Sequence, residues 1–160
     1  MGYNVDTTDV NFIILQENLY DAYRAMCDLN KDDSQKMGGS LGQHKNTEDI
    51  ANSNSVSTNP NKWFSWMSWN YDEICEDSFE IFSELGFEVD EDCNGDLLLV
   101  GYRGKSGQVD VFLDAVAPYV EPGSYIDWMG EDGYLFRNEF DGKKMEVKEG
   151  LIQWVPVNRA

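Results

Sequence analysis

Basic side chains are scarce in this sequence, in which 12 Lys and Arg stand against 30 Asp and Glu and give a formal net charge of −18. Nucleic acids and anionic membranes are bound through clustered Lys and Arg, so this balance argues against either as a direct partner. The balance favours the opposite kind of partner, a protein with a basic surface. No apolar run approaches 18 residues, so no transmembrane helix is expected.

Histidine and cysteine are also rare. His44 is the only histidine and lies in a polar segment, which argues against Ser-His-Asp and Cys-His catalysis and against His-based metal sites. Cys27, Cys75 and Cys93 contain no C-x-x-C pair and are expected to be reduced thiols of a cytoplasmic protein. The N-terminus lacks the basic start and apolar run of a secretory signal. These shortages predict a non-enzymatic cytoplasmic protein without cofactor or metal.

Hydrophobic residues make up 41% and aromatic residues 13% of the 160 positions, which is enough for an ordinary core in a single domain spanning residues 1–160. Residues 31–61 differ, because Ser, Asn, Asp, Gly and Gln dominate there and no periodic apolar face appears. We expect this stretch to be a polar, mobile insertion within the domain. Met37, Leu41 and Ile50 could form one short helical turn in it.

The rest of the chain alternates between strand and helix patterns. Apolar spacing predicts helices over 19–29 (capped by Asn18), 71–85 (capped by Asn70 and ended by Gly86) and 109–116. Strand patterns fall at 10–15, 87–89, 97–100, 124–129, 134–140, 144–147 and 151–155. These elements predict an α+β fold in which about three helices pack on one face of a mostly antiparallel sheet that ends in a C-terminal β-meander.

The negative charge is concentrated in one quarter of the chain. Residues 63–102 carry eleven acidic and no basic side chains. Glu76, Glu80 and Glu84 recur every four residues, a spacing that places like charges together on one helix face and destabilises the helix. The candidate partner-binding acids are Asp72, Glu73, Glu76, Asp77, Glu80, Glu84, Asp90, Glu91 and Asp92. They form either a merely solvated surface or a surface that imitates the regular charges of a nucleic-acid backbone.

A tryptophan cluster precedes these acids in the sequence. Trp63, Trp66 and Trp69 recur every third residue, so they cannot all point the same way in a strand, and at least one should be partly exposed. Most of the cluster is expected in the core. Trp63 and Trp66 are candidate aromatic anchors for a protein partner.

The segment Asp90 to Gly95 matches the first half of an EF-hand calcium loop, D-x-D-x-N-G. The twelfth position, which requires a bidentate Glu, is Gly101, and the preceding residues have a strand pattern. We therefore interpret this segment as an acidic hairpin that turns at Asn94-Gly95.

The block from Ala117 to Gly133, APYVEPGSYIDWMGEDG, resembles a pattern in small acidic proteins of phages and mobile elements, and the resemblance covers roughly residues 63–155. Some small acidic phage proteins, anti-CRISPR and anti-restriction inhibitors among them, bind host nucleases at their nucleic-acid channels. The resemblance implies a bacterial host cell and a nucleic-acid-binding protein partner, and it assigns no functional residues.

The leading hypothesis is therefore a non-enzymatic inhibitor that occupies the nucleic-acid-binding surface of a host defence nuclease, such as a CRISPR effector, by charge mimicry. In a second hypothesis the contact is made by the aromatic residues or by residues 31–61, and the charge serves only solubility. A nucleotide- or signal-binding protein, a small carboxylate-based enzyme and a phage accessory protein remain further alternatives.

Overall fold

The computed structural model describes residues 2–40 and 50–158 and shows an α+β fold. A six-stranded, fully antiparallel sheet has the order β4-β5-β1-β6-β7-β8. Its strands are β1 (Asn4–Ile14), β4 (Phe87–Glu91), β5 (Leu97–Lys105), β6 (Tyr125–Gly130), β7 (Leu135–Phe140) and β8 (Met145–Gly150). The predicted fold class and the meander of β6 to β8 are confirmed.

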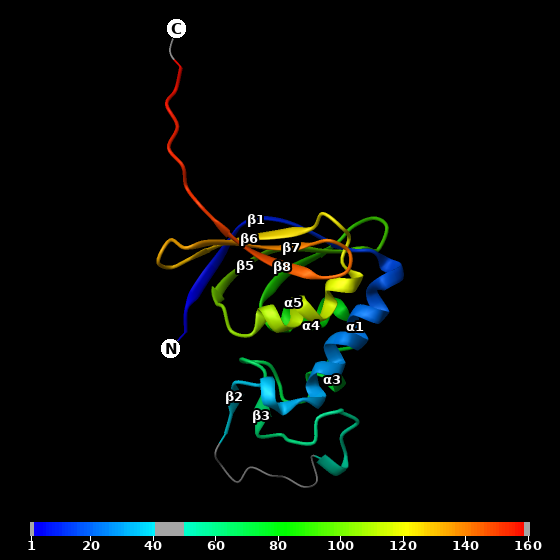
Figure 1. The fold of residues 1–160 in the computed structure, drawn as a ribbon. Helices are drawn as coiled ribbons and strands as arrows, with labels where there is room; N and C mark the ends of the chain where they lie inside the picture. Colours follow the sequence, from blue (N-terminus) through cyan, green and yellow to red (C-terminus); the bar gives the residue numbers. More distant parts are fainter. Residues whose placement is uncertain (1, 41–49, 159–160) are drawn as a thin grey trace.

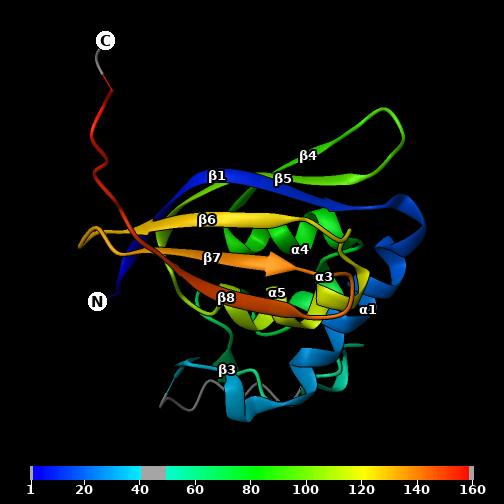
Figure 2. The ribbon, with the colours of Figure 1, turned by 45° about the horizontal axis from the view of Figure 1, so that its top comes forward.

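Helices cover one face of this sheet (Figures 1 and 2). They are α1 (Leu19–Asp28), α4 (Ser78–Leu85) and α5 (Val109–Val116). The sheet order places β4 and β8 at opposite edges. Among the described helices, none has both the length and the apolar composition needed to cross a bilayer.

The core lies between the helices and the inner face of the sheet. Phe12, at its centre, packs edge-to-face against Phe82 of α4 and Phe140 of β7, with ring centroids 5.9 and 5.2 Å away. Trp128 is buried nearby, and its indole N–H donates a 2.6 Å hydrogen bond to the Asn138 side-chain oxygen. The polar atom of the indole is therefore satisfied, as burial of a tryptophan requires.

Two local predictions were wrong. The Asn18 side chain caps nothing, because a short 3₁₀ turn (Gln16–Asn18) leads directly into α1. Residues 151–158 form no strand and are exposed after β8 ends at Gly150. The apolar pattern over 151–155 resembled a strand, but within the described residues no strand pairs with it.

Residues 31–40 and 50–70 form a second, smaller layer beside the helices (Figure 1). It contains the two-stranded pairing of β2 (Gly38–Gly39) with β3 (Lys62–Trp63). Met37 is exposed and not helical, and residues 50–51 are helical. Leu41 and His44 lie outside the described residues, so the turn predicted for Met37, Leu41 and Ile50 stays a prediction at Leu41. Whether this layer is mobile stays a prediction.

The buried ammonium of Lys36 links this layer to the 3₁₀ turn (Leu29–Lys31) that follows α1. It donates hydrogen bonds to the Asn30 carbonyl at 3.0 Å and to Ser57 Oγ at 3.4 Å, and it forms a 2.6 Å ion pair with Asp33. The ammonium also lies 5.8 Å from the ring centre of Phe64. A buried lysine needs such partners, so segments far apart in the sequence are held together around this side chain.

Asp72 fastens residues 55–56 to the rest of the fold. One carboxylate oxygen accepts hydrogen bonds from Asn30 Nδ2 and Ser55 Oγ at 2.8 and 2.6 Å, and the other accepts the Val56 N–H at 2.8 Å. These three donors surround a half-buried carboxylate. Hydrogen bonds to a charged acceptor contribute more than those between neutral groups.

Asp72→Asn is expected to lower the free energy of unfolding by about 1–3 kcal/mol. The Asn side chain has only one acceptor oxygen, so its N–H₂ group would point at a donor that a carboxylate oxygen now accepts. The matched substitution Glu88→Gln, at an exposed side chain without a hydrogen-bond partner in the described residues, is expected to stay within about 0.5 kcal/mol of the parent chain. Urea unfolding of both variants measures the difference. Equal midpoints and slopes would contradict this role of Asp72.

Candidate protein-binding surface

The acidic segment is two helices and not one. α3 (Tyr71–Ile74) ends at Cys75, whose backbone is extended, and α4 begins after Asp77. Glu76, Glu80 and Glu84 therefore do not form one stripe on a continuous helix, and the prediction of a single helix over 71–85 was wrong. The predicted cap was wrong as well, because the Asn70 side chain makes no capping hydrogen bond. The prediction that Gly86 ends the helix is confirmed, since it adopts φ +112° as the C-terminal residue.

A capping motif begins α4. Asp77 Oδ1 accepts the Glu80 N–H at 2.9 Å, and Glu80 Oε2 accepts the Glu76 N–H at 3.0 Å. The sequence Asp77-Ser-Phe-Glu80 is thus an N-terminal helix signal that lies inside an apolar pattern of helical spacing. That apolar spacing concealed the signal, because Cys75 and Ser78 remain buried on both sides of the break.

The break is also held against α1. The Tyr23 hydroxyl donates to the Cys75 carbonyl at 2.6 Å, and Ser78 Oγ donates to the Leu19 carbonyl at 2.8 Å. Burial raises the pKa of the Tyr23 hydroxyl, so it remains a donor at neutral pH. These two contacts fix where Glu76 and Asp77 lie relative to α1.

Many of the acids have structural partners within the chain. Asp72 and Glu73 accept hydrogen bonds from the segment 53–56, and Asp77 and Glu80 form the helix cap. Asp92 accepts the N–H groups of Asn94 and Asp96 in the hairpin turn, and Asp90 accepts the N–H of Glu91. Asp96 is buried and accepts the Gln16 N–H at 2.8 Å. Much of the acidic composition of this segment therefore has a structural role within the chain.

Four acids of the 63–102 segment have no side-chain hydrogen bond or ion pair within the described residues: Glu76, Glu84, Glu88 and Glu91. The salt bridges found in the described parts of the chain involve none of the eleven acids in that segment. Glu76, Glu88 and Glu91 are exposed and Glu84 is half-buried. Their negative charge is therefore available to an external cation.

A groove of about 380 Å³ connects two of these acids with the aromatic side chains of α1. Glu76 and Asp77 come from the junction between α3 and α4, and Glu91 comes from β4. The rest of the lining is Gln16, Leu19, Tyr20, Tyr23, Ser78, Phe79 and Gly95. Tyr20 is 65% exposed, and its ring centre lies 6.5 Å from that of Tyr23. We call this the acidic groove. Three of the acids predicted to bind a partner, Glu76, Asp77 and Glu91, therefore line the same groove although they are up to fifteen residues apart in the sequence.

Sequence reasoning missed the aromatic side of the acidic groove. Tyr20 lies off the buried face of α1 formed by Ala22 and Met26, and an exposed tyrosine at such a position was the available signal. Acids beside aromatic faces can bind a guanidinium or ammonium through both charge and the ring quadrupole.

The two predicted tryptophan anchors lie elsewhere. Trp63 is half-buried and contacts Gly38, where an added Cβ would lie 2.2 Å from the indole, while Trp66 is 47% exposed and packs over Gly107. The expectation that at least one tryptophan of the cluster is partly exposed is confirmed. The expectation that most of the tryptophan cluster lies in the core was wrong, because Trp63 and Trp69 are half-buried and the buried side chains of this stretch are Phe64 and Met67. Neither Trp63 nor Trp66 lines the acidic groove.

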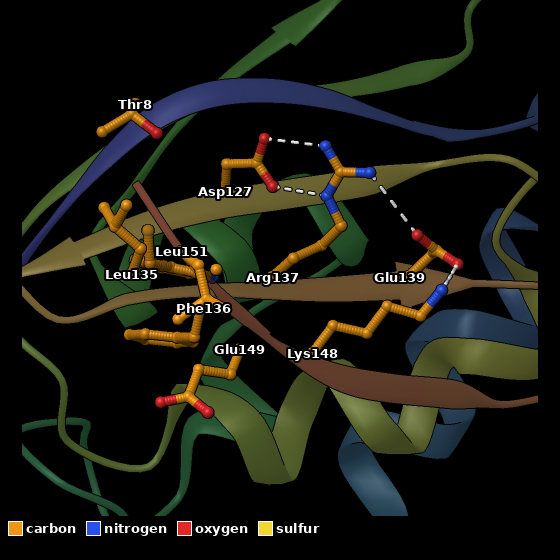
Figure 3. A pocket seen from close by; sticks show the side chains of 11 residues that line it. Thr8, Asp127, Leu135, Phe136, Arg137, Glu139, Lys148, Glu149 and Leu151 are labelled. Carbon is orange, nitrogen blue, oxygen red and sulfur yellow. Dashed lines mark hydrogen bonds and ion pairs between the residues drawn. The ribbon is translucent and has the colours of Figure 1, made fainter. Parts of the chain in front are cut away.

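The outer face of the sheet presents the opposite electrostatic situation (Figure 3). Arg137 forms a bidentate pair with Asp127 at 2.6 and 2.9 Å, and Glu139 accepts from both Arg137 and Lys148. Lys148 and Arg137 lower the pKa of the Glu139 carboxyl. Asp127 and Glu139 are thus neutralised by Arg137 and Lys148. Within the described residues, no basic side chain pairs in this way with the acids of the acidic groove.

The predicted hairpin is confirmed, with Gly95 at φ +82° in the turn between β4 and β5. Within residues 2–40 and 50–158, no group of three or more His, Cys, Asp or Glu side chains is placed to hold a metal ion.

The chain matches no family model, and no curated protein and no solved structure shows significant similarity to it.

The cysteines report on the acidic surroundings of the helix break. Burial, with the nearby carboxylates of Glu84 and Glu80, raises the pKa of the Cys75 thiol to about 12, and burial also raises that of Cys27. Cys93 is exposed in the hairpin. Because the thiolate is the reactive form, a rise from 9 to about 12 lowers its fraction at pH 8 roughly a thousandfold.

Iodoacetamide at pH 8 is therefore expected to modify Cys93 rapidly and to leave Cys27 and Cys75 largely protected in the folded chain, with all three reacting in urea. Peptide mass spectrometry over time measures each rate. Modification of Cys75 as fast as that of Cys93 in the folded state would show that the helix break is open to solvent.

Proposed function

We propose that the chain is a binding protein that uses the acidic groove to occupy a basic, nucleic-acid-binding surface of a protein partner. The observation that carries this proposal is the set of acids within residues 63–102 that have no partner in the described residues, Glu76, Glu84, Glu88 and Glu91, of which two line a groove with exposed tyrosine. The resemblance to small acidic phage proteins favours a host defence nuclease, such as a CRISPR effector, in the bacterial cytoplasm.

Unpaired carboxylates on a folded protein repel one another and are kept at some cost in stability. The chain neutralises carboxylates on the sheet face with Arg137 and Lys148 but provides no such base for Glu76 or Glu91 within the described residues. A cationic partner would supply the missing counter-charges. Its Arg side chains could also stack on Tyr20, as guanidinium groups do on aromatic faces.

Charge also determines how such a complex depends on salt. When a nuclease channel binds DNA, its basic side chains displace the counterions that surround the DNA phosphates. An acidic protein that takes the place of DNA contacts the same basic side chains. Inhibition is therefore expected to weaken steeply between about 50 and 200 mM salt, as DNA binding does. A contact made mainly through apolar side chains would lack this dependence.

The substitutions Glu76→Lys, Glu84→Lys and Glu91→Lys change acids that make no side-chain hydrogen bond within the described residues. Together they are expected to weaken inhibition by on the order of 100-fold, because each places a like charge against the basic surface. Displacement of labelled target DNA from a purified RNA-guided nuclease measures the loss.

The matched control is Asp114→Lys, Glu121→Lys and Glu146→Lys, which changes the net charge equally at residues outside both the acidic groove and the 63–102 segment to which Glu84 belongs. It is expected to retain most of the inhibition. Thermal unfolding verifies that both triple variants fold. Equal inhibition by the two variants would mean that net charge alone, and not the acidic groove, governs binding.

A further inference from the structure

Residues 151–158 follow β8 as an extended segment that leaves the sheet and the helices and points away from both (Figures 1 and 2). Its apolar side chains are between 67% and 91% exposed, among them Leu151, Ile152, Trp154, Val155 and Val157. Water-exposed apolar side chains in such a concentration mark an interaction site. We call residues 151–158 the apolar segment.

The same chain offers a surface of matching character. β8 is an edge strand of the sheet, hydrogen-bonded only to β7 in the described structure. Beside it a cleft of about 310 Å³ lies between the meander and the start of α5. Its apolar lining consists of Val5, Val109, Leu113, Trp128, Phe136 and Val147. Val147, on β8 itself, is 59% exposed.

The apolar segment is poorly suited to fold back onto its own β8. A tight hairpin needs residues such as Asn-Gly or Asp-Gly between its strands, and Gly150-Leu151-Ile152 provides no such pair. The segment instead continues in the direction of β8 away from the sheet. A second molecule can accept it without any turn.

We propose that two copies of this chain associate by exchanging their apolar segments, each of which lies along the β8 edge of the other copy with side chains in the cleft beside it. Strand addition to an exposed sheet edge supplies backbone hydrogen bonds, and the cleft supplies apolar contact. Pro156 lacks an N–H group, which an added edge strand tolerates.

Charge places the contact at this edge. Residues 143–158 carry three basic and two acidic side chains, a net charge of +1 in a chain of −18. The acidic strand β4 lies at one edge of the sheet, and β8 lies at the opposite edge. Association through β8 therefore joins the least acidic parts of two strongly acidic molecules and keeps their acidic grooves at the distal edges.

The available area is that of a stable dimer. Burial of a Val, Leu or Ile side chain removes on the order of 80 Å² from water and that of a Trp about 200 Å², so each apolar segment can bury roughly 500 Å². Two reciprocal contacts, counted on both surfaces, bury about 2,000 Å², within the range of specific protein interfaces.

Sedimentation equilibrium of the full chain over about 1–100 μM is expected to show a dimer. Trp154→Ser with Val155→Ser is expected to weaken it by about 30-fold or more, as loss of a central aromatic contact does. Met37→Ser, at an equally exposed apolar side chain outside the segment, is expected to leave it unchanged. A monomer at every concentration, open-ended polymers or an unaffected dimer in the double variant would overturn the proposal.

Reciprocity has its own test. A chain that ends at Gly150 keeps the cleft, and a Val147→Lys chain keeps the apolar segment but places an ammonium beside the cleft. Each is expected to be monomeric alone, whereas their mixture forms a one-to-one heterodimer through the single intact contact. A mixture that remains monomeric would overturn exchange of the segments. Because the contact is apolar, high salt should preserve it, which separates this association from binding at the acidic groove.

Discussion

The arrangement of the acids depends on the interruption between α3 and α4. Had residues 71–85 continued as one helix, Glu76, Glu80 and Glu84 would have shared one face. Instead Asp77 caps α4, and Tyr23 and Ser78 bind the interruption to α1. This junction brings Glu76 and Asp77 into one groove with the tyrosines of α1 and with Glu91 of β4. The acidic groove is thus a consequence of hydrogen bonds between side chains and the backbone and not of helical periodicity.

The acidic composition has two distinct physical roles. Some carboxylates accept hydrogen bonds from backbone N–H groups that no backbone carbonyl of the described residues accepts. Asp72 and Glu73 do this for the segment 53–56, Asp77 at the start of α4, and Asp92 in the hairpin turn. These acids are needed for folding whatever the chain binds. Others, such as Glu76 and Glu91, make no such contacts in the described residues and remain available. A net charge of −18 therefore overstates the charge that is offered to a partner.

The sequence was sufficient for the elements with strong, unambiguous patterns. The helix of residues 19–28, the Asn94-Gly95 hairpin and the meander follow from local periodicity and turn residues. The helix break was not predicted because Tyr71, Cys75, Ser78 and Ile81 are all buried across it, which imitates one continuous apolar face. The contribution of Tyr20 to the acidic groove depends on the packing of α1 against α4, a long-range arrangement that local patterns do not contain.

The two edges of the sheet differ in charge and in chemistry. The β4 edge and α4 carry carboxylates that have no partner within the described residues, and the β8 edge leads into an uncharged apolar segment.

The central claim is that the acidic groove recognises cationic side chains, and NMR titration of the isotope-labelled chain with an oligo-arginine peptide tests it most directly. The account predicts salt-sensitive amide shifts concentrated at residues 16–23, 76–80 and 91–95. Shifts spread over all acids, or centred on the Arg137 face of the sheet, would contradict it.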